Sequence, residues 1–230
     1  MTSEQLAWKI CRHDVEMTHI SGGSHIGAVL SVADIVGVLY ADILRYRPEE
    51  PKWDGRDRLV MSKGHAGAAV YAALAECGFF PVEDLLTLRH IGSYLQGHPN
   101  RLLTPGVDMS TGSLGQGISA AVGMALGAKH QGKDFRVYTL LGDGEIQEGQ
   151  VWEACMAAAH YKLDNLVVVV DNNGLQIDGD VAKVMSPYPI DAKLAAFGFH
   201  VECIDGHDFD QIEAALNKAK TVKGQPCAIV

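Results

Sequence analysis

Two apolar segments, each ending in a cluster of polar residues and glycines, constrain the fold of this chain more than any other feature. FRVYTLL (135–141) is followed by Gly142-Asp143-Gly144, and NLVVVVD (165–171) is followed by two asparagines, Asn172 and Asn173. Both segments are short and apolar, as buried strands are. EIQEGQVWEACMAAAHYK (145–162), which separates them, has the length and composition of a helix. Strand, helix and strand in this order predict a parallel βαβ unit.

The rest of the chain continues this alternation of helices and apolar strands. We expect further helices at residues 4–20, 31–45, 81–89, 117–130, 191–197 and 208–220, and further strands at residues 199–204 and 227–230. A turn at Ser62–Gly64 is expected to lead into an alanine-rich helix that ends at Gly78. The pattern predicts an α/β fold, with a parallel β-sheet flanked by helices. No internal repeat or second core is evident, so residues 1–230 are expected to form a single domain. The last strand reaches Val230, and we expect the natural chain to continue past it.

Charge and cysteine usage exclude several classes of protein. The formal charge is 19 − 28 = −9, which disfavours binding to nucleic acid or to acidic membranes. No apolar stretch is long enough to span a bilayer, and the N-terminus has the pattern of a capped amphipathic helix instead of a signal peptide. The five cysteines are widely spaced and form no C-x-x-C motif, which favours reduced thiols in a cytoplasmic protein.

The two strand ends predict a site for a metal ion and a phosphate group. Parallel strands end at one edge of a sheet, and Asp143 and Asn173 are 30 residues apart, about one βαβ unit. A carboxylate, a carboxamide oxygen and the backbone carbonyl of Leu175 are hard oxygen ligands, which suit Mg²⁺ or Ca²⁺. Three protein ligands leave room for phosphate oxygens. The helix expected from Glu145 would direct its positive end into the same space.

Two other interpretations of these motifs were weighed. GDG and NNG are also common in tight turns, although this does not explain why both follow strands one βαβ unit apart. A nicotinamide-binding Rossmann site needs G-x-G-x-x-G, but Gln147 occupies the third glycine position. GSLGQG (112–117) has its glycines in the wrong order for that site.

GDGEIQEG followed by VDNNGLQIDG closely resembles the form of the thiamine diphosphate motif that is found in transketolases. The resemblance covers nearly the whole chain, through SHIG (24–27), SKGHA (62–66), GHP (97–99), TGSLGQGISAAVGMA (111–125), GQVWEA (149–154) and IDGHD (204–208). The histidine motifs and TGSLGQG are more specific to transketolases than GDG is. The resemblance implies the thiamine diphosphate-binding fold and the N-terminal, diphosphate-binding domain of a transketolase.

The resemblance also implies roles for particular residues. It assigns the Mg²⁺ ligands to Asp143, Asn173 and the carbonyl of Leu175. Residues implied to hold thiamine diphosphate are His65, Gly112, Ser113, Leu114, Gly142, Gly144, Glu145 and Asn173. Residues implied to serve catalysis are His25 and His98, which match histidines lining the sugar channel, and Glu148, which matches a glutamate linking cofactor sites across a dimer.

The chemistry of ketose cleavage independently favours histidines in this site. Cleavage of a ketose develops negative charge on oxygen, and imidazoles supply hydrogen-bond donors and proton shuttles there. His25, His65 and His98 each lie beside glycines in a loop, as expected for functional histidines. The other histidines are expected to be structural or exposed (His13, His19, His90, His130, His160 and His200). The role of His207, in DGHD, is left open.

The sequence departs from the transketolase pattern in two respects. First, SHIG replaces the commoner GHPG, with Ile26 where proline is usual. Second, the pyrimidine-binding domain and a further substrate histidine of the family are absent from residues 1–230. The resemblance therefore implies one subunit of a split transketolase. Such a subunit transfers a two-carbon ketol unit from a ketose phosphate to an aldose phosphate, and only together with a C-terminal subunit that carries the pyrimidine-binding domain. A homodimer of this chain within an α2β2 assembly is expected.

Other functions remain open at this point. The chain could be half of a 1-deoxyxylulose-phosphate synthase-like enzyme or a subunit of a 2-oxo acid dehydrogenase, although the sugar-channel histidines disfavour the dehydrogenase. It could also be a non-catalytic binding or regulatory subunit. The sequence does not identify the donor and acceptor sugars.

Overall fold

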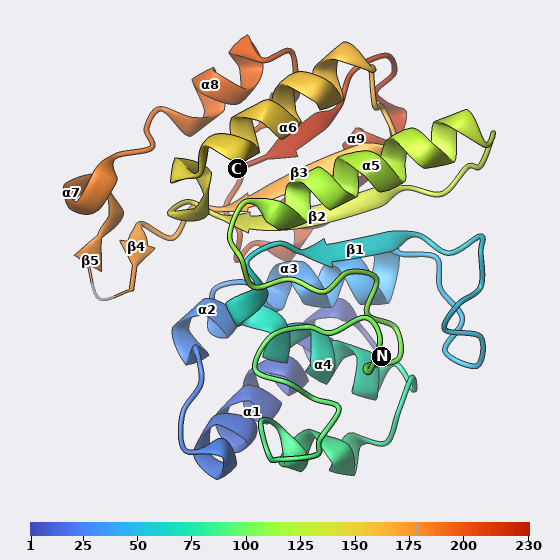
Figure 1. Cartoon of the computed structure of the whole chain (residues 1–230), viewed down its shortest axis with the longest axis vertical. Coiled ribbons are helices and arrows are strands. Elements are labelled where there is room, and N and C mark those ends of the chain that lie inside the picture. Colours follow the sequence, from blue (N-terminus) through green and yellow to red (C-terminus); the bar gives the residue numbers. More distant parts are fainter. Residues whose placement is uncertain (178) are drawn as a thin grey trace.

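A five-stranded parallel sheet forms the centre of the protein in a computed structural model, which describes residues 1–177 and 179–230 (Figure 1). The strand order is β1-β2-β3-β7-β6, and every neighbouring pair is parallel. The strands are β1 (Arg58–Met61), β2 (Val137–Gly142), β3 (Leu166–Asp171), β6 (His200–Glu202) and β7 (Cys227–Ile229). The predicted α/β class and parallel sheet are confirmed.

Helices cover both faces of the sheet. One face packs against α1 (Ser3–Ser21), α2 (Ile26–Leu30), α3 (Ala33–Val38) with a π-helical turn at Leu39–Ile43, α4 (Gly67–Glu76) and α9 (Phe209–Thr221). The other face packs against α5 (Gln116–His130), α6 (Gly149–His160) and α8 (Ile190–Ala196). Short 3₁₀ turns lie at Gly64–Ala66, Val82–Thr87 and Glu145–Gln147. A small antiparallel pair, β4 (Leu175–Gln176) and β5 (Gly179–Asp180), and α7 (Val181–Met185) project from the sheet at the left of Figure 1.

Alternating side chains of the strands divide the core into two layers. Tyr138 and Leu140 of β2 belong to the same core cluster as residues of α1, α3 and α4, whereas Val137 and Leu141 belong to the cluster that includes α5 and α6. This is the two-residue period of a strand with apolar residues on both faces. Because both faces are covered, every residue of β2 and β3 is buried, which explains why the two segments are almost entirely apolar.

Helix boundaries differ from the sequence-based prediction at the residues after β2. We expected a helix from residue 145, but residues Glu145–Gln147 form a 3₁₀ turn and α6 begins only at Gly149. The Glu145 carboxylate turns back to accept hydrogen bonds from the backbone N–H of Gly115 (2.9 Å) and of Gly142 (3.1 Å). These contacts hold the turn against the end of β2 and delay the start of the helix.

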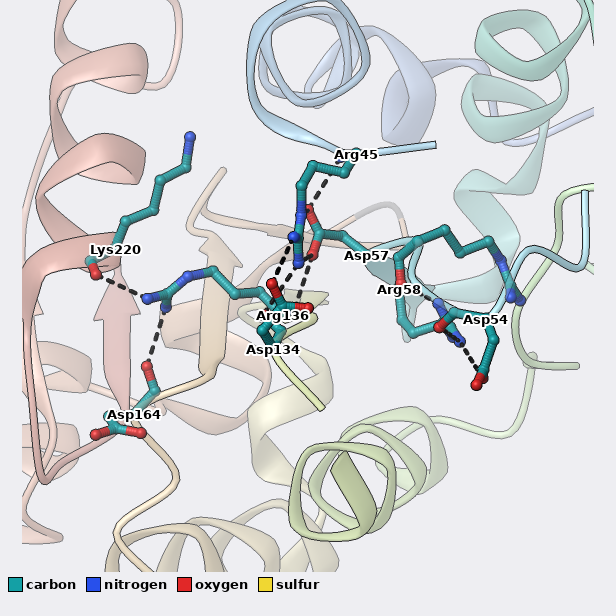
Figure 2. A network of polar contacts seen from close by, with 9 residues as sticks. Arg45, Asp54, Asp57, Arg58, Asp134, Arg136, Asp164 and Lys220 are labelled. Carbon is teal, nitrogen blue, oxygen red and sulfur yellow. Dashed lines mark hydrogen bonds and ion pairs between the residues drawn. The ribbon is translucent and has the colours of Figure 1, made fainter. Parts of the chain in front are cut away.

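A network of charged residues joins the amino ends of the strands (Figure 2). The buried Asp57 carboxylate accepts hydrogen bonds from the backbone N–H and the guanidinium of Arg45 (3.0 and 3.1 Å) and from the backbone N–H of Arg136 (2.8 Å). The Arg136 guanidinium donates to the carbonyl oxygens of Asp164 (3.0 Å) and Lys220 (2.7 Å). The network therefore connects the segments that precede β1, β2 and β3 with the end of α9.

Replacing Asp57 is expected to destabilise the protein much more than replacing the other acid that pairs with Arg45. Asp57→Ala removes the shared acceptor of two backbone N–H groups and of the half-exposed Arg45 guanidinium, and should cost about 2–4 kcal/mol of unfolding free energy. Asp134 also pairs with Arg45 (3.0 Å), but its side chain is 84% exposed, so Asp134→Ala should cost less than about 1 kcal/mol. Urea unfolding of both variants measures the difference, and equal losses would contradict this role of Asp57.

Candidate functional site

The ends of β2 and β3 lie side by side, and direct hydrogen bonds join the motifs that follow them. Gly142 pairs with Asp171 in the sheet register, and the N–H of Asp143 donates to the carbonyl of Asp171 (3.1 Å). The Asp143 carboxylate accepts from the N–H of Gly144 (2.8 Å) and from the N–H of Gly174 (2.7 Å). The structure thus brings the GDG and NNG motifs together at the carboxyl edge of the sheet.

The loop of Asn173 and Leu175 folds around a glycine turn beside Asp143. Gly174 has φ +76°, a conformation that favours glycine. The Asn173 side-chain oxygen accepts from the N–H of Leu175 (2.9 Å), and its side-chain nitrogen donates to the Asp171 carboxylate (3.0 Å). Leu175, at the start of β4, exposes its side chain. The turn therefore places the other two predicted ligand residues, Asn173 and Leu175, on either side of Gly174, whose N–H donates to the Asp143 carboxylate.

The oxygen atoms at this edge fit a divalent cation. The Asp143 residue is only 1% exposed, and burial raises the pKa of its carboxyl. A carboxylate can accept about four hydrogen bonds, and the two oxygens of Asp143 each accept one backbone N–H. In the described part of the chain no group of three or more His, Cys, Asp and Glu side chains could hold a metal. The donor set here is instead one carboxylate with amide and carbonyl oxygens, which Mg²⁺ accepts.

Close contacts between glycine-rich loops shape the space next to Asp143. A Cβ atom on Gly64 would lie 2.6 Å from the backbone nitrogen of Gly112, and Gly112 itself has φ +147°. Glycine at position 64 therefore lets the loops at residues 62–66 and 111–115 approach this closely, and glycine at position 112 allows the backbone conformation of the second loop. Ser113 is exposed and Leu114 is half-buried in the second loop. The two loops therefore bring their backbone N–H and carbonyl groups to the carboxyl edge of the sheet.

Glu145 joins three segments around this space. Besides the N–H groups of Gly115 and Gly142, its carboxylate accepts a hydrogen bond from the Ser62 hydroxyl. The side chain is buried, and burial raises the pKa of Glu145. Both of its oxygens are engaged with protein donors, so Glu145 fixes the loops that surround the site. Its predicted contact with a cofactor stays a prediction.

The three histidines singled out in the sequence gather in one place. The rings of His25 and His65 meet edge to face with centroids 5.2 Å apart, and a Cβ atom on Gly112 would lie 3.0 Å from the ring of His98. Burial, with Lys63 and the neighbouring histidines, lowers the pKa of His65 to about 4. Although His98 is an exposed residue, partial desolvation, with His25 and Arg89, also lowers its pKa. Both imidazoles are therefore neutral at pH 7.

Glu148 lies beside Gly115, the residue that precedes α5. It is exposed and immediately precedes α6. A Cβ atom on Gly115 would lie 2.9 Å from the Cβ of Glu148, so the glutamate is next to the turn that begins α5. The described side-chain hydrogen bonds and ion pairs do not join it to the histidines, and its predicted catalytic role stays a prediction.

Three residues of the site were missed in the sequence. Lys63 is 1% exposed and forms an ion pair with Asp171, which also accepts a hydrogen bond from the Ser31 hydroxyl (2.7 Å). The sequence contained two signals of this ion pair: Lys63 lies inside the SKGHA motif, and Asp171 ends a run of valines. Both charged residues were instead interpreted as parts of a turn and of a strand end.

His207, whose role was left open, contacts α3. Its Nδ1 atom lies 2.7 Å from the Asp34 carboxylate. It also lines a cavity of about 280 Å³ beside Asp171, between α3, α9 and the ends of β3 and β7. His207 therefore connects the segment after β6 with α3, next to the ends of the strands.

Comparisons with known proteins agree with this geometry. A family model described as "Transketolase, thiamine diphosphate binding domain" matches residues 6–230. The 6-deoxy-6-sulfo-D-fructose transketolase subunit SqwG of Clostridium sp. (strain MSTE9) is 46% identical over 209 residues, which cover 91% of this chain and 76% of that protein. One subunit of the apulose-4-phosphate transketolase of Phocaeicola vulgatus is 44% identical over 198 residues, covering 86% of this chain and 70% of that protein.

Solved structures show the same fold over the whole chain. The transketolase from Leishmania mexicana superposes with a TM-score of 0.96 at 35% sequence identity, covering 100% of this chain and 36% of that one. The chain thus spans about a third of the length of the solved transketolases. In the described residues, no helix is long and apolar enough to cross a membrane. The chain belongs to the transketolase family, as the thiamine diphosphate-binding domain of a transketolase-type transferase.

Proposed function

We propose that this chain binds thiamine diphosphate through Mg²⁺ (or Ca²⁺) and supplies half of an active site that transfers a two-carbon ketol unit from a ketose phosphate to an aldose phosphate. The observation that carries this proposal is the hydrogen bond between the Asp143 carboxylate and the N–H of Gly174 (2.7 Å). It holds a buried carboxylate against the loop of Asn173, so these residues would hold a metal ion, which would supply positive charge for binding a diphosphate.

The metal ligands in this proposal are Asp143, Asn173 and the carbonyl oxygen of Leu175. The diphosphate and the thiazolium ring would be held by His65, Gly112, Ser113, Leu114, Gly142, Gly144 and the segment that Glu145 positions. Because the protein carries a net charge of −9, a diphosphate needs such local donors and a cation. A neutral His65 can donate one N–H to a phosphate oxygen.

In this proposal, His25 and His98 contact the sugar substrate and transfer protons to and from its oxygens. When bound, thiamine diphosphate supplies a nucleophilic carbon and an electron sink for cleavage of the ketose. Both imidazoles are exposed beside His65. A neutral imidazole can accept a proton from a sugar hydroxyl and return it to an oxygen that gains negative charge. Glu148 is proposed to contact a second copy of the chain near its cofactor.

The proposed partner is a C-terminal transketolase subunit that carries the pyrimidine-binding domain. Two of the relatives are named as transketolase subunits, and the chain matches only about a third of single-chain transketolases. We propose that residues 1–230 form one domain, which pairs as a homodimer within an α2β2 assembly in the cytoplasm. No nucleic acid or membrane partner is proposed.

Asp143→Asn is expected to weaken Mg²⁺-dependent binding of thiamine diphosphate by at least about 100-fold, because a charged ligand becomes neutral while the side chain keeps its shape. Calorimetric titration of the chain together with its partner measures the affinity. Asp134→Asn, an exposed acid at the opposite edge of the sheet, is the matched control and should bind normally. Unchanged affinity in Asp143→Asn would refute the metal site.

His25→Ala and His98→Ala are expected to lower the rate of ketol transfer while binding thiamine diphosphate with wild-type affinity. Loss of a proton shuttle or an oriented donor should reduce turnover by about 10²–10⁴-fold. A coupled assay with a ketose phosphate donor and an aldose phosphate acceptor measures the rate. His130→Ala, at the exposed end of α5, is the control. Wild-type turnover in both variants would remove these histidines from the mechanism.

A further inference from the structure

Asp171, the last residue of β3, receives hydrogen bonds from three different segments. One carboxylate oxygen accepts from the Ser31 hydroxyl at the end of α2 (2.7 Å). The other accepts from the Lys63 ammonium group, in the loop after β1, and from the Asn173 side-chain nitrogen (3.0 Å). Both Asp171 and Lys63 are buried. One carboxylate thus connects α2, the 62–66 loop and the NNG loop.

The contact with Asp171 fixes which way the Asn173 carboxamide faces. An ionised carboxylate only accepts hydrogen bonds, so it is the NH₂ group of Asn173 that must point at Asp171. The amide oxygen is then turned to the other side, where it accepts from the N–H of Leu175 (2.9 Å). Two contacts therefore define the orientation of the amide, and loss of the Asp171 contact leaves only the Leu175 N–H to keep the oxygen, and not the nitrogen, on the side where a cation would bind.

The same carboxylate also holds the loop that carries His65. Lys63 is two residues before His65, and its ammonium group ends at Asp171. A buried ion pair of this kind adds little net stability compared with apolar residues of similar volume. Stability alone therefore does not account for placing a lysine and an aspartate in the interior at this point of the sheet.

We propose that Asp171, held by Lys63 and Ser31, is a positioning residue that orients the Asn173 carboxamide and the His65 loop for a metal-bound diphosphate. This inference rests on the proposed function of the site. Groups that orient metal ligands commonly change metal affinity by about 10–100-fold when they are removed. Asp171 acts through Asn173 and Lys63 and is not itself assigned to the metal.

A matched pair of substitutions separates positioning from a purely structural role. Asp57 is the control, because its carboxylate is also buried and also receives several hydrogen bonds, but it lies at the opposite edge of the sheet. Asp171→Asn and Asp57→Asn are made in the chain together with its partner. Mg²⁺ is titrated at a fixed concentration of thiamine diphosphate, and the thermal unfolding of each protein is recorded without metal.

Asp171→Asn should weaken Mg²⁺ binding by about 10–100-fold, whereas Asp57→Asn should lower the melting temperature and leave Mg²⁺ binding unchanged. The Asn side chain has one acceptor oxygen and an NH₂ group, so it cannot accept from Ser31, Lys63 and Asn173 together. Equal Mg²⁺ affinity in the wild type and in Asp171→Asn overturns this inference alone. A wild-type protein that binds no Mg²⁺ with thiamine diphosphate overturns the proposed function and this inference with it.

Ser31→Ala is the milder variant and decides the matter if Asp171→Asn does not fold. It removes one hydrogen bond to Asp171 and keeps the ion pair with Lys63. We expect Mg²⁺ binding to weaken on the order of 3–10-fold, because one of the hydrogen bonds that hold the Asp171 carboxylate is lost. Wild-type Mg²⁺ affinity in a folded Ser31→Ala protein then overturns the inference.

Discussion

The parallel pairing of β2 with β3, in register from Val137 to Gly142, is the constraint on which the site depends. It places Asp143 and the NNG loop at the same height of the sheet, where the Asp143 carboxylate reaches the N–H of Gly174. A shift of one residue would turn every side chain of β3 to the opposite face. The division of the core into two layers forbids such a shift, because both faces of these strands are packed. Packing of the interior thus determines the geometry of the site.

The two edges of the sheet use buried acids differently. At the amino edge, Asp57 neutralises Arg45, which remains 43% exposed, and this network joins the starts of the strands. At the carboxyl edge, the buried acids are Asp143, Glu145 and Asp171, and among the described ion pairs only Asp171 has a cationic partner. Burial raises the pKa of both Asp143 and Glu145. A cluster of buried acids lowers the stability of the folded protein, because the charged carboxylates lose their hydration. Such clusters are a common feature of functional sites. A bound cation would offset part of this cost at Asp143.

The sequence was sufficient to predict β2, β3, β6 and β7 and the approach of the GDG and NNG motifs, because period, length and topology determine where parallel strands end. It did not determine the start of α6, since the position of Gly149 depends on long-range contacts of Glu145 with Gly115 and Ser62. The gathering of His25, His65 and His98 followed from the family resemblance, because these residues come from three separate loops. The sequence did not predict the roles of Lys63 and Asp171, because charged residues are seldom buried. Only the folded structure shows that the two residues form an ion pair.

The central claim is that this chain contains one half of a transketolase active site. The most direct test is to purify the chain and a C-terminal transketolase subunit separately, and to follow ketol transfer as one is titrated with the other in Mg²⁺ and thiamine diphosphate. We expect no transfer by either chain alone and activity that saturates at equal amounts of the two chains. Full activity from this chain in the absence of the other subunit would contradict it.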